Sequence, residues 1–143
     1  MKKFLCLLLV FVFAFVLVGC GECDHNYVEG KCADCGKVFK IGLICLHDES
    51  STYDKNFIDS MYRALDELGL EKSQLELVTG IAEDSSCYEK ASELAQTCDI
   101  VFADSFGHED FMIFAAQENE DVWFCHSTGT KAHTAGLNNY YNA

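Results

Sequence analysis

The sequence predicts an α/β fold built on a parallel, doubly wound sheet. Three observations lead to this prediction. Between residues 40 and 126, short apolar runs alternate with segments whose apolar residues recur at helical spacing. The apolar runs begin about 23 to 35 residues apart, which leaves room for a strand and a crossover helix. Because such crossovers are right-handed, successive strands lie parallel in one sheet, with helices on both of its faces.

Four apolar runs are the predicted strands. Each run is short and is bounded by charged or polar residues, as is typical of strands buried in a parallel sheet. The runs cover residues 40–46, 75–79, 99–103 and 122–125.

Three helices are predicted between these strands, over Asn56–Leu68, Ser86–Thr97 and Glu109–Glu118. In the first helix, apolar residues recur at helical spacing until Gly69 ends the pattern. These residues are Phe57, Met61, Leu65 and Leu68. Before the second helix, Ser86 and Glu89 have the spacing of a capping box. The third helix is expected to turn Phe111, Met112 and Ala115 toward the core.

The start of the chain has the features of a secretory signal peptide. Lys2 and Lys3 precede a run of uncharged, almost wholly apolar residues from Phe4 to Val18, which is too short to span a bilayer comfortably. The following Leu17-Val18-Gly19-Cys20 resembles the bacterial lipobox. We therefore predict that residues 1–19 are removed and that Cys20 is lipidated, which anchors the chain to the extracytoplasmic face of the cell membrane. The alternative is an ordinary signal peptide with a cysteine nearby.

The charge of the chain excludes some partners. The formal net charge is −13, and residues 1–19 contain two lysines but no acidic residue. The mature chain then has eight basic residues against 23 acidic ones. Such a surface repels nucleic acid and anionic lipid headgroups, so we expect no nucleic-acid partner.

No enzymatic activity is expected from the motifs. The sequence contains neither a Gly-x-Gly-x-x-Gly fingerprint nor a P-loop. Cys125 and His126 are adjacent in a predicted strand, so their side chains point to opposite faces and cannot form a nucleophile–base pair.

Residues 20–39 are predicted to be a lipid-anchored tether with a zinc knuckle of Cys and His ligands. Its candidate metal ligands are Cys23, His25, Cys32 and Cys35. Zinc in structural sites takes four nitrogen or sulfur ligands in a tetrahedron, and no other cofactor is expected. A Cys-x-x-Cys redox pair is one alternative, although no helix follows it as in a thioredoxin-type site. Free or disulfide-bonded cysteines are another, although seven cysteines after Cys20 do not fit a fully paired framework.

Polar or glycine-rich residues follow each predicted strand. In a doubly wound sheet, ligands bind outside the carboxyl ends of the strands. Asp48 follows the first strand, and Asp104 and Ser105 follow the third. These residues are therefore candidates for ligand binding, although each also suits helix capping or a solvated loop.

Three segments resemble the basic membrane protein family of substrate-binding lipoproteins, which includes purine nucleoside receptors. They are Tyr53-Asp-Lys-Asn-Phe-Ile-Asp-Ser60, Asp99-Ile-Val-Phe-Ala-Asp-Ser-Phe-Gly-His108 and Phe124-Cys-His-Ser-Thr-Gly-Thr-Lys-Ala-His133, the last followed by Asn138-Asn-Tyr-Tyr-Asn142. The resemblance covers about residues 40–143. It implies a type I periplasmic-binding-protein fold with two lobes. Residues 40–143 would be an incomplete N-terminal lobe, from a fragment or a truncated product.

The resemblance also implies a function. The chain would be the membrane-anchored solute-binding protein of an ABC importer, with an ABC permease as its partner and a nucleoside-like ligand. Phe57 would stack on the nucleobase, and Asp48 and Asp104 would accept hydrogen bonds from ribose hydroxyls, next to Ser105. From the residues alone, Phe57 is equally well the first core residue of its helix. The alternatives are a ligand-sensing receptor module without transport and an extracytoplasmic zinc- or thiol-binding lipoprotein.

Overall fold

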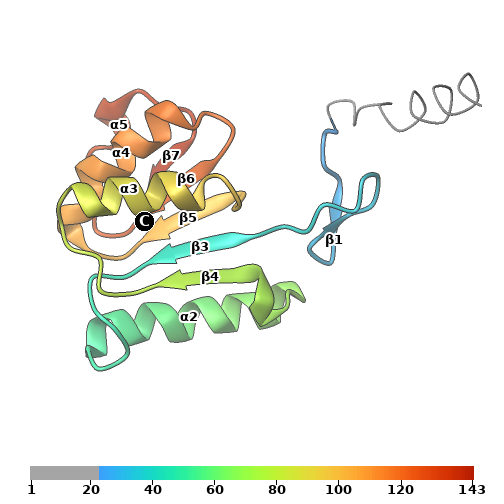
Figure 1. The fold of residues 1–143 in the computed structure, drawn as a ribbon, viewed down its shortest axis with the longest axis horizontal. Helices are drawn as coiled ribbons and strands as arrows, with labels where there is room; N and C mark the ends of the chain where they lie inside the picture. Colours follow the sequence, from blue (N-terminus) through green and yellow to red (C-terminus); the bar gives the residue numbers. More distant parts are fainter. Residues whose placement is uncertain (1–22) are drawn as a thin grey trace, which may run out of the picture.

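A five-stranded parallel sheet forms the body of the molecule (Figure 1). The computed structural model describes residues 23–143. The predicted signal peptide and the lipidation site Cys20 lie outside these described residues. Along the sheet the strands are ordered β4-β3-β5-β6-β7. Among residues 23–143, no helix is long and apolar enough to cross a membrane.

All four predicted strands form, and all four are parallel. The strands of the sheet are β3 (Ile41–Ile44), β4 (Leu75–Val78), β5 (Ile100–Ala103), β6 (Trp123–His126) and β7 (Tyr140–Asn142). Strand β3 pairs with both β4 and β5, so the chain crosses β3 between its second and third strands. The sequence did not predict β7, which pairs in parallel with β6.

The three predicted helices form, a short fourth helix was not predicted, and α2 and α3 differ from prediction in their boundaries. They are α2 (Thr52–Leu68), α3 (Ser85–Leu94), α4 (Glu109–Glu118) and a short α5 (Ala132–Ala135). The prediction for α4 is confirmed at both ends. Helix α2 begins four residues earlier than predicted because Ser51 caps it and accepts the N–H of Asp54. The predicted capping box of Ser86 and Glu89 is wrong, since Asp84 caps α3 by accepting the N–H of Ser86 at 2.8 Å.

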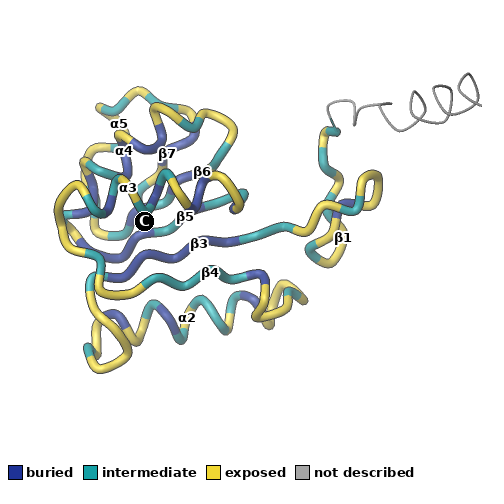
Figure 2. The backbone as a smooth tube through the Cα atoms, in the orientation of Figure 1, coloured by how far each residue is buried: buried dark blue, intermediate teal, exposed yellow. Residues whose placement is uncertain are grey.

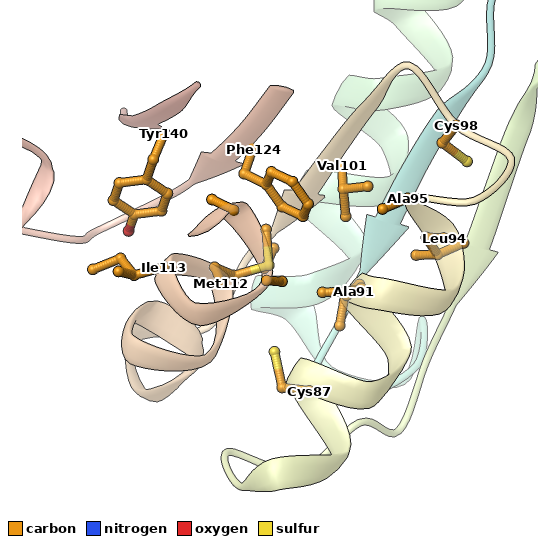
Figure 3. Packing of buried hydrophobic residues seen from close by; sticks show 14 residues of the cluster. Cys87, Ala91, Leu94, Ala95, Cys98, Val101, Met112, Ile113, Phe124 and Tyr140 are labelled. Atoms are coloured by element: carbon orange, nitrogen blue, oxygen red, sulfur yellow. The ribbon is translucent and has the colours of Figure 1, made fainter. Parts of the chain in front are cut away.

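Two apolar layers hold the helices against the sheet. Because side chains alternate along a strand, Ile44, Val101 and Phe124 point to one face, where α3 and α4 cover them (Figure 3). On the other face, Leu43 and Cys45 pack against Ile58 of α2. Figure 2 shows that the whole of β3 is buried between these layers. The helices therefore cover both faces, which confirms the doubly wound arrangement.

Helix α2 covers only one side of its face of the sheet. Ile58 and Leu65 are fully buried, whereas Leu68, the last residue of the apolar repeat, is 64% exposed at the last turn. Leu43 is in register with Phe102, Cys125 and Tyr141 across the sheet. The burial falls along this row, since Leu43 is buried and Tyr141 is 46% exposed. The face over β5 to β7 is thus partly open.

A small antiparallel hairpin precedes the sheet. It consists of β1 (Tyr27–Val28) and β2 (Lys31–Cys32), and it lies beyond the amino ends of the strands (Figure 1). Polar contacts join it to the sheet: the Tyr27 hydroxyl donates to Asp99 at 3.0 Å, and Gln74 Nε2 donates to the carbonyl of Phe39 at 2.8 Å. The hairpin and the carboxyl ends of the strands are therefore at opposite edges of the sheet.

Candidate functional site

Buried polar side chains gather at the carboxyl edge of the sheet. Eight polar or charged side chains are buried among the described residues, and six of them follow β3 or β5 or end β6. These six are Asp54, Asp104, Ser105, His108, Glu109 and His126. The chain leaves β3 toward β4 on one side and returns to β5 on the other, so the topological switch point lies between β3 and β5. Ligands of open α/β sheets bind at such a point.

A pair of buried carboxyl groups lies at the switch point. Side-chain atoms of Asp54, Asp104 and Cys45 all lie within 4.8 Å of one another. Burial opposes the ionisation of Asp54, but hydrogen bonds from Ser51 and from the backbone N–H of His47 outweigh it and lower the pKa of Asp54. Burial, aided by the nearby charge of Asp54, raises the pKa of Asp104. The pair therefore favours one ionised carboxylate, on Asp54, and one protonated carboxyl, on Asp104.

Asp104 is fully buried in this structure. Its Oδ1 accepts the backbone N–H of Leu46 at 3.2 Å, and its Oδ2 has no hydrogen-bond partner among the described residues. Its backbone carbonyl accepts the hydroxyls of Tyr53 and Ser127, each at 2.9 Å. The residue thus ties the loop after β3, the first turn of α2 and the loop after β6 together.

Asp48 lies on the surface of the β3–α2 loop. Its Oδ1 accepts hydrogen bonds from the backbone N–H and the hydroxyl of Ser50, at 2.9 and 2.5 Å. These hydrogen bonds lower the pKa of Asp48, so the carboxylate is ionised. The second carboxylate oxygen remains available to a donor from outside.

Ser105 joins the loop after β5 to the loop after β4. Its hydroxyl donates to Glu83 Oε1 at 2.5 Å, and the N–H of Gly107 donates to the same oxygen at 2.8 Å. The hydrogen bond from Ser105 is the main cause that lowers the pKa of Glu83. Glu83, which the sequence analysis missed, is therefore the charged group closest to Ser105 at this edge.

Phe57 forms an aromatic pair with Tyr53 on α2. Their ring centroids are 5.1 Å apart, and the planes are tilted by 55°. Phe57 is half-buried and borders an apolar groove of about 320 Å³ that Met61, Phe102 and Cys125 also line. Tyr53 is 47% exposed. The sequence analysis missed the role of Tyr53, although its spacing of four residues from Phe57 is the signal for a shared helix face.

His126 is a third residue that the sequence analysis did not assign to the site. Its Nε2 lies 2.6 Å from the carbonyl oxygen of Ser105, and its Nδ1 has no partner among the described residues. Burial lowers its pKa, so the ring is neutral and Nε2 carries the proton that the carbonyl accepts. A Cβ at Gly129 would lie 2.5 Å from this Nδ1 and 2.1 Å from Asn142. The chain around Gly129 is therefore tightly packed against His126 and Asn142.

The four candidate metal ligands lie together at the opposite edge. The ligand atoms of Cys23, His25, Cys32 and Cys35 are all within 4.8 Å of one another. The backbone N–H groups of Cys35 and Asp34 donate to the sulfur of Cys32 and lower its pKa to about 6, against the opposing effect of desolvation. Such hydrogen bonds favour the thiolate, which is the form that binds metals.

The fold is shared with solved structures of low sequence identity. One is a solute-binding protein of an ABC transporter system from Conexibacter woesei DSM 14684, with a TM-score of 0.61 and 15% identity over 73% of this chain and 34% of that chain. A second is a transcriptional activator of the comK gene from Bacillus halodurans, with a TM-score of 0.57 and 13% identity over 72% of this chain and 33% of that chain. The present chain spans about a third of the length of each.

A third similar structure is much closer in length. It is a protein from Peptoclostridium difficile 630 described as a lipoprotein fragment, with a TM-score of 0.53 and 14% identity over 73% of this chain and 83% of that chain. No protein-family model and no curated protein matches the chain. At these identities the similarity establishes the α/β fold.

Proposed function

We infer that this chain supplies one lobe of a solute-binding protein that is anchored through Cys20 at the extracytoplasmic face of the cell membrane. Its partner would be an ABC permease, and its ligand would be nucleoside-like. The observation that carries the proposal is the cluster of buried polar side chains at the switch point of a doubly wound sheet. The fold shared with an ABC solute-binding protein supports the same assignment.

The chemistry of the edge supports a ligand with a flat ring and hydroxyl groups. The Tyr53–Phe57 pair offers an aromatic surface next to the loop after β3. Stacking on such a surface suits any nucleobase, because every base has a π-face. Asp48 presents an ionised carboxylate in the same loop, and a carboxylate accepts hydrogen bonds from neighbouring hydroxyls.

Asp104 and Ser105 complete the proposed site from the β5 side. The Oδ2 atom of Asp104 has no partner among the described residues, so it is available for one further hydrogen bond, in which the protonated carboxyl donates to a ligand oxygen. Since Asp104 is fully buried, a ligand hydroxyl reaches this atom only after the side chains packed around it move. Ser105 donates to Glu83 at 2.5 Å and so holds the loop after β5 to the loop after β4.

A nucleoside titration followed by NMR tests this function. With adenosine or inosine as the probe, we expect amide shifts in residues 46–57 and 104–107. The affinity should be weak, because Asp48 and Tyr53 are exposed and one open edge buries little of a small ligand. Phe57→Ala should reduce the binding free energy by about 1–3 kcal/mol if the ring stacks on the base.

Phe114→Ala is the matched control for this titration. Phe114 is also a helical phenylalanine, 50% exposed, but it belongs to α4 and is not part of the edge after β3. The Phe114→Ala variant should bind the nucleoside with the same affinity as the unmodified chain. Equal affinities of the Phe57→Ala variant and the unmodified chain, or the absence of shifts in the two loops, would contradict the proposed nucleoside site.

A further inference from the structure

We propose that Cys23, His25, Cys32 and Cys35 form a structural zinc site that holds the hairpin segment, residues 23–39, in its fold. This site is independent of the proposed ligand edge, because it lies at the amino ends of the strands. It would make the segment a Cys3His zinc module placed between the lipid anchor and the sheet.

The separations of the ligand atoms match a tetrahedron of the required size. Zinc binds thiolate sulfur at about 2.3 Å and imidazole nitrogen at about 2.0–2.1 Å, so tetrahedral angles place two sulfurs about 3.8 Å apart and a sulfur and a nitrogen about 3.5 Å apart. The sulfurs of Cys23 and Cys32 are 3.6 Å apart. The sulfur of Cys35 is 3.3 Å from Nδ1 of His25. The four atoms are therefore already spaced as ligands around one ion.

The backbone adopts unusual conformations at this cluster. His25 has a φ of 31°, which is uncommon for a residue other than glycine, and it turns the chain so that Cys23 and His25 meet the cluster together. Gly36, with a φ of 77°, follows the Cys-x-x-Cys pair, and its N–H donates to the carbonyl of Cys32 at 2.9 Å. Strained backbone persists where surrounding contacts hold it, and a metal–nitrogen bond to His25 would be such a contact.

The segment lacks the apolar core that would otherwise stabilise it. Of residues 23–39, Cys32 is the one buried apolar side chain. Within the segment, Tyr27 packs edge-on against Phe39, with ring centroids 5.2 Å apart, and polar contacts of these two residues with Asp99 and Gln74 join the segment to the rest of the chain. Small units without a sufficient core are usually stabilised by disulfides or by a metal. Because three sulfurs and one nitrogen converge here, a single disulfide would leave a thiol and the imidazole without a role, and a metal uses all four.

The ligand set favours zinc over other ions. Three thiolates and an imidazole are borderline-soft donors, and a closed set of four such ligands is typical of structural zinc. Calcium and magnesium are disfavoured because they require oxygen ligands.

Metal analysis of the full-length chain tests the proposal. The protein would be produced in a bacterium without oxygen and purified in detergent with a reductant. We expect about one zinc per chain. After exchange into cobalt, we expect the near-ultraviolet charge-transfer band that thiolate ligands give and the visible bands of a tetrahedral ion.

Variants of exposed ligands keep the test independent of folding. Cys35 is exposed, so Cys35→Ser creates no cavity, and His25→Ala removes the nitrogen ligand. Both variants should lose zinc and the cobalt bands while the circular dichroism of the sheet and helices is kept. Cys125→Ser and His133→Ala are the matched controls outside the cluster, and they should retain one zinc.

Three results would overturn the proposal. The first is a chain that holds no zinc after zinc has been added and the excess removed. The second is a disulfide between Cys23 and Cys32 in protein kept under reductant, detected by mass spectrometry. The third is full zinc content in both Cys35→Ser and His25→Ala.

Discussion

The sheet with its helices buries an apolar layer on each face, whereas the hairpin segment, residues 23–39, buries a single apolar side chain, that of Cys32. The difference follows from length. A segment of this size cannot remove enough apolar surface from water to offset the entropy lost on ordering its chain. The sheet therefore folds through its core, and the hairpin depends on polar contacts and on the proposed metal.

The two regions also lie at opposite edges of the same sheet. The hairpin contacts Asp99, which precedes β5, while the proposed ligand residues Asp104 and Ser105 follow that strand. Cys20, the predicted anchor, is close in sequence to the first residue of the hairpin segment. In the proposed function, the region next to the membrane anchor is thus separated from the ligand edge by the length of the strands.

Removal of a core side chain should have the largest effect on stability. Phe124 is fully buried between β6 and α4, so Phe124→Ala should lower the free energy of unfolding by about 3–5 kcal/mol, through lost burial and the cavity left behind. Urea unfolding followed by circular dichroism measures this loss. Trp123→Ala is the control, because Trp123 is 48% exposed on the same strand and should cost clearly less. Equal losses in the two variants would contradict the proposed core.

Removal of the contact between the two regions should have a smaller and local effect. Asp99 accepts hydrogen bonds from Tyr27 at 3.0 Å and from Lys37 at 2.5 Å. Asp99→Ala should therefore lower the free energy of local opening of the hairpin by about 1–3 kcal/mol, as is typical of hydrogen bonds to a charged group. Hydrogen exchange of the hairpin amides measures this free energy of opening. Asp121→Ala is the control, because Asp121 is an exposed aspartate. An equal loss of protection in the centre of the sheet would contradict a local effect.

The smallest effect is expected from the carboxyl pair, and it depends on pH. The folded pKa of Asp104 is raised above its ordinary value of 3.8, so the folded chain loses stability as pH rises from that value through the folded pKa. Asp104→Asn removes this loss and keeps the shape of the side chain. The variant should gain stability relative to the unmodified chain as pH rises from about 4 to 7. Urea unfolding at several pH values measures the difference, and a difference that does not change with pH would contradict the protonated state of Asp104.

The strands of the sheet could be predicted from the sequence because each is marked by an apolar run of neighbouring residues. Runs such as Ile41–Ile44 and Ile100–Ala103 are recognisable from their own residues. Strand β7 was missed because Tyr140 and Tyr141 stand among asparagines, and only pairing with β6 makes them a strand. The start of α2 was missed because it is set by Ser51, whose hydroxyl accepts the N–H of Asp54 and donates to its carboxylate, a pattern that apolar periodicity does not reveal.

The two candidate sites also differ in how far local sequence patterns reveal them. The four residues of the hairpin cluster lie within thirteen positions of one another, so their spacing alone suggested a shared site. The contact of Asp54 with Asp104 joins residues from different elements, and no local pattern reveals it. The deep burial of Asp104, and the attachment of Tyr53 to its carbonyl, likewise depend on the packing of α2 against the end of β5.

Hydrogen exchange with and without a zinc chelator tests the difference between the two regions most directly. We expect the chelator to remove the protection of amides in residues 27–39, while the amides of β3 and β5 keep theirs because the core holds the sheet. Restoring zinc should restore the hairpin's protection. Unchanged protection of the hairpin in metal-free protein, or equal loss of protection in the hairpin and the sheet, would contradict the account.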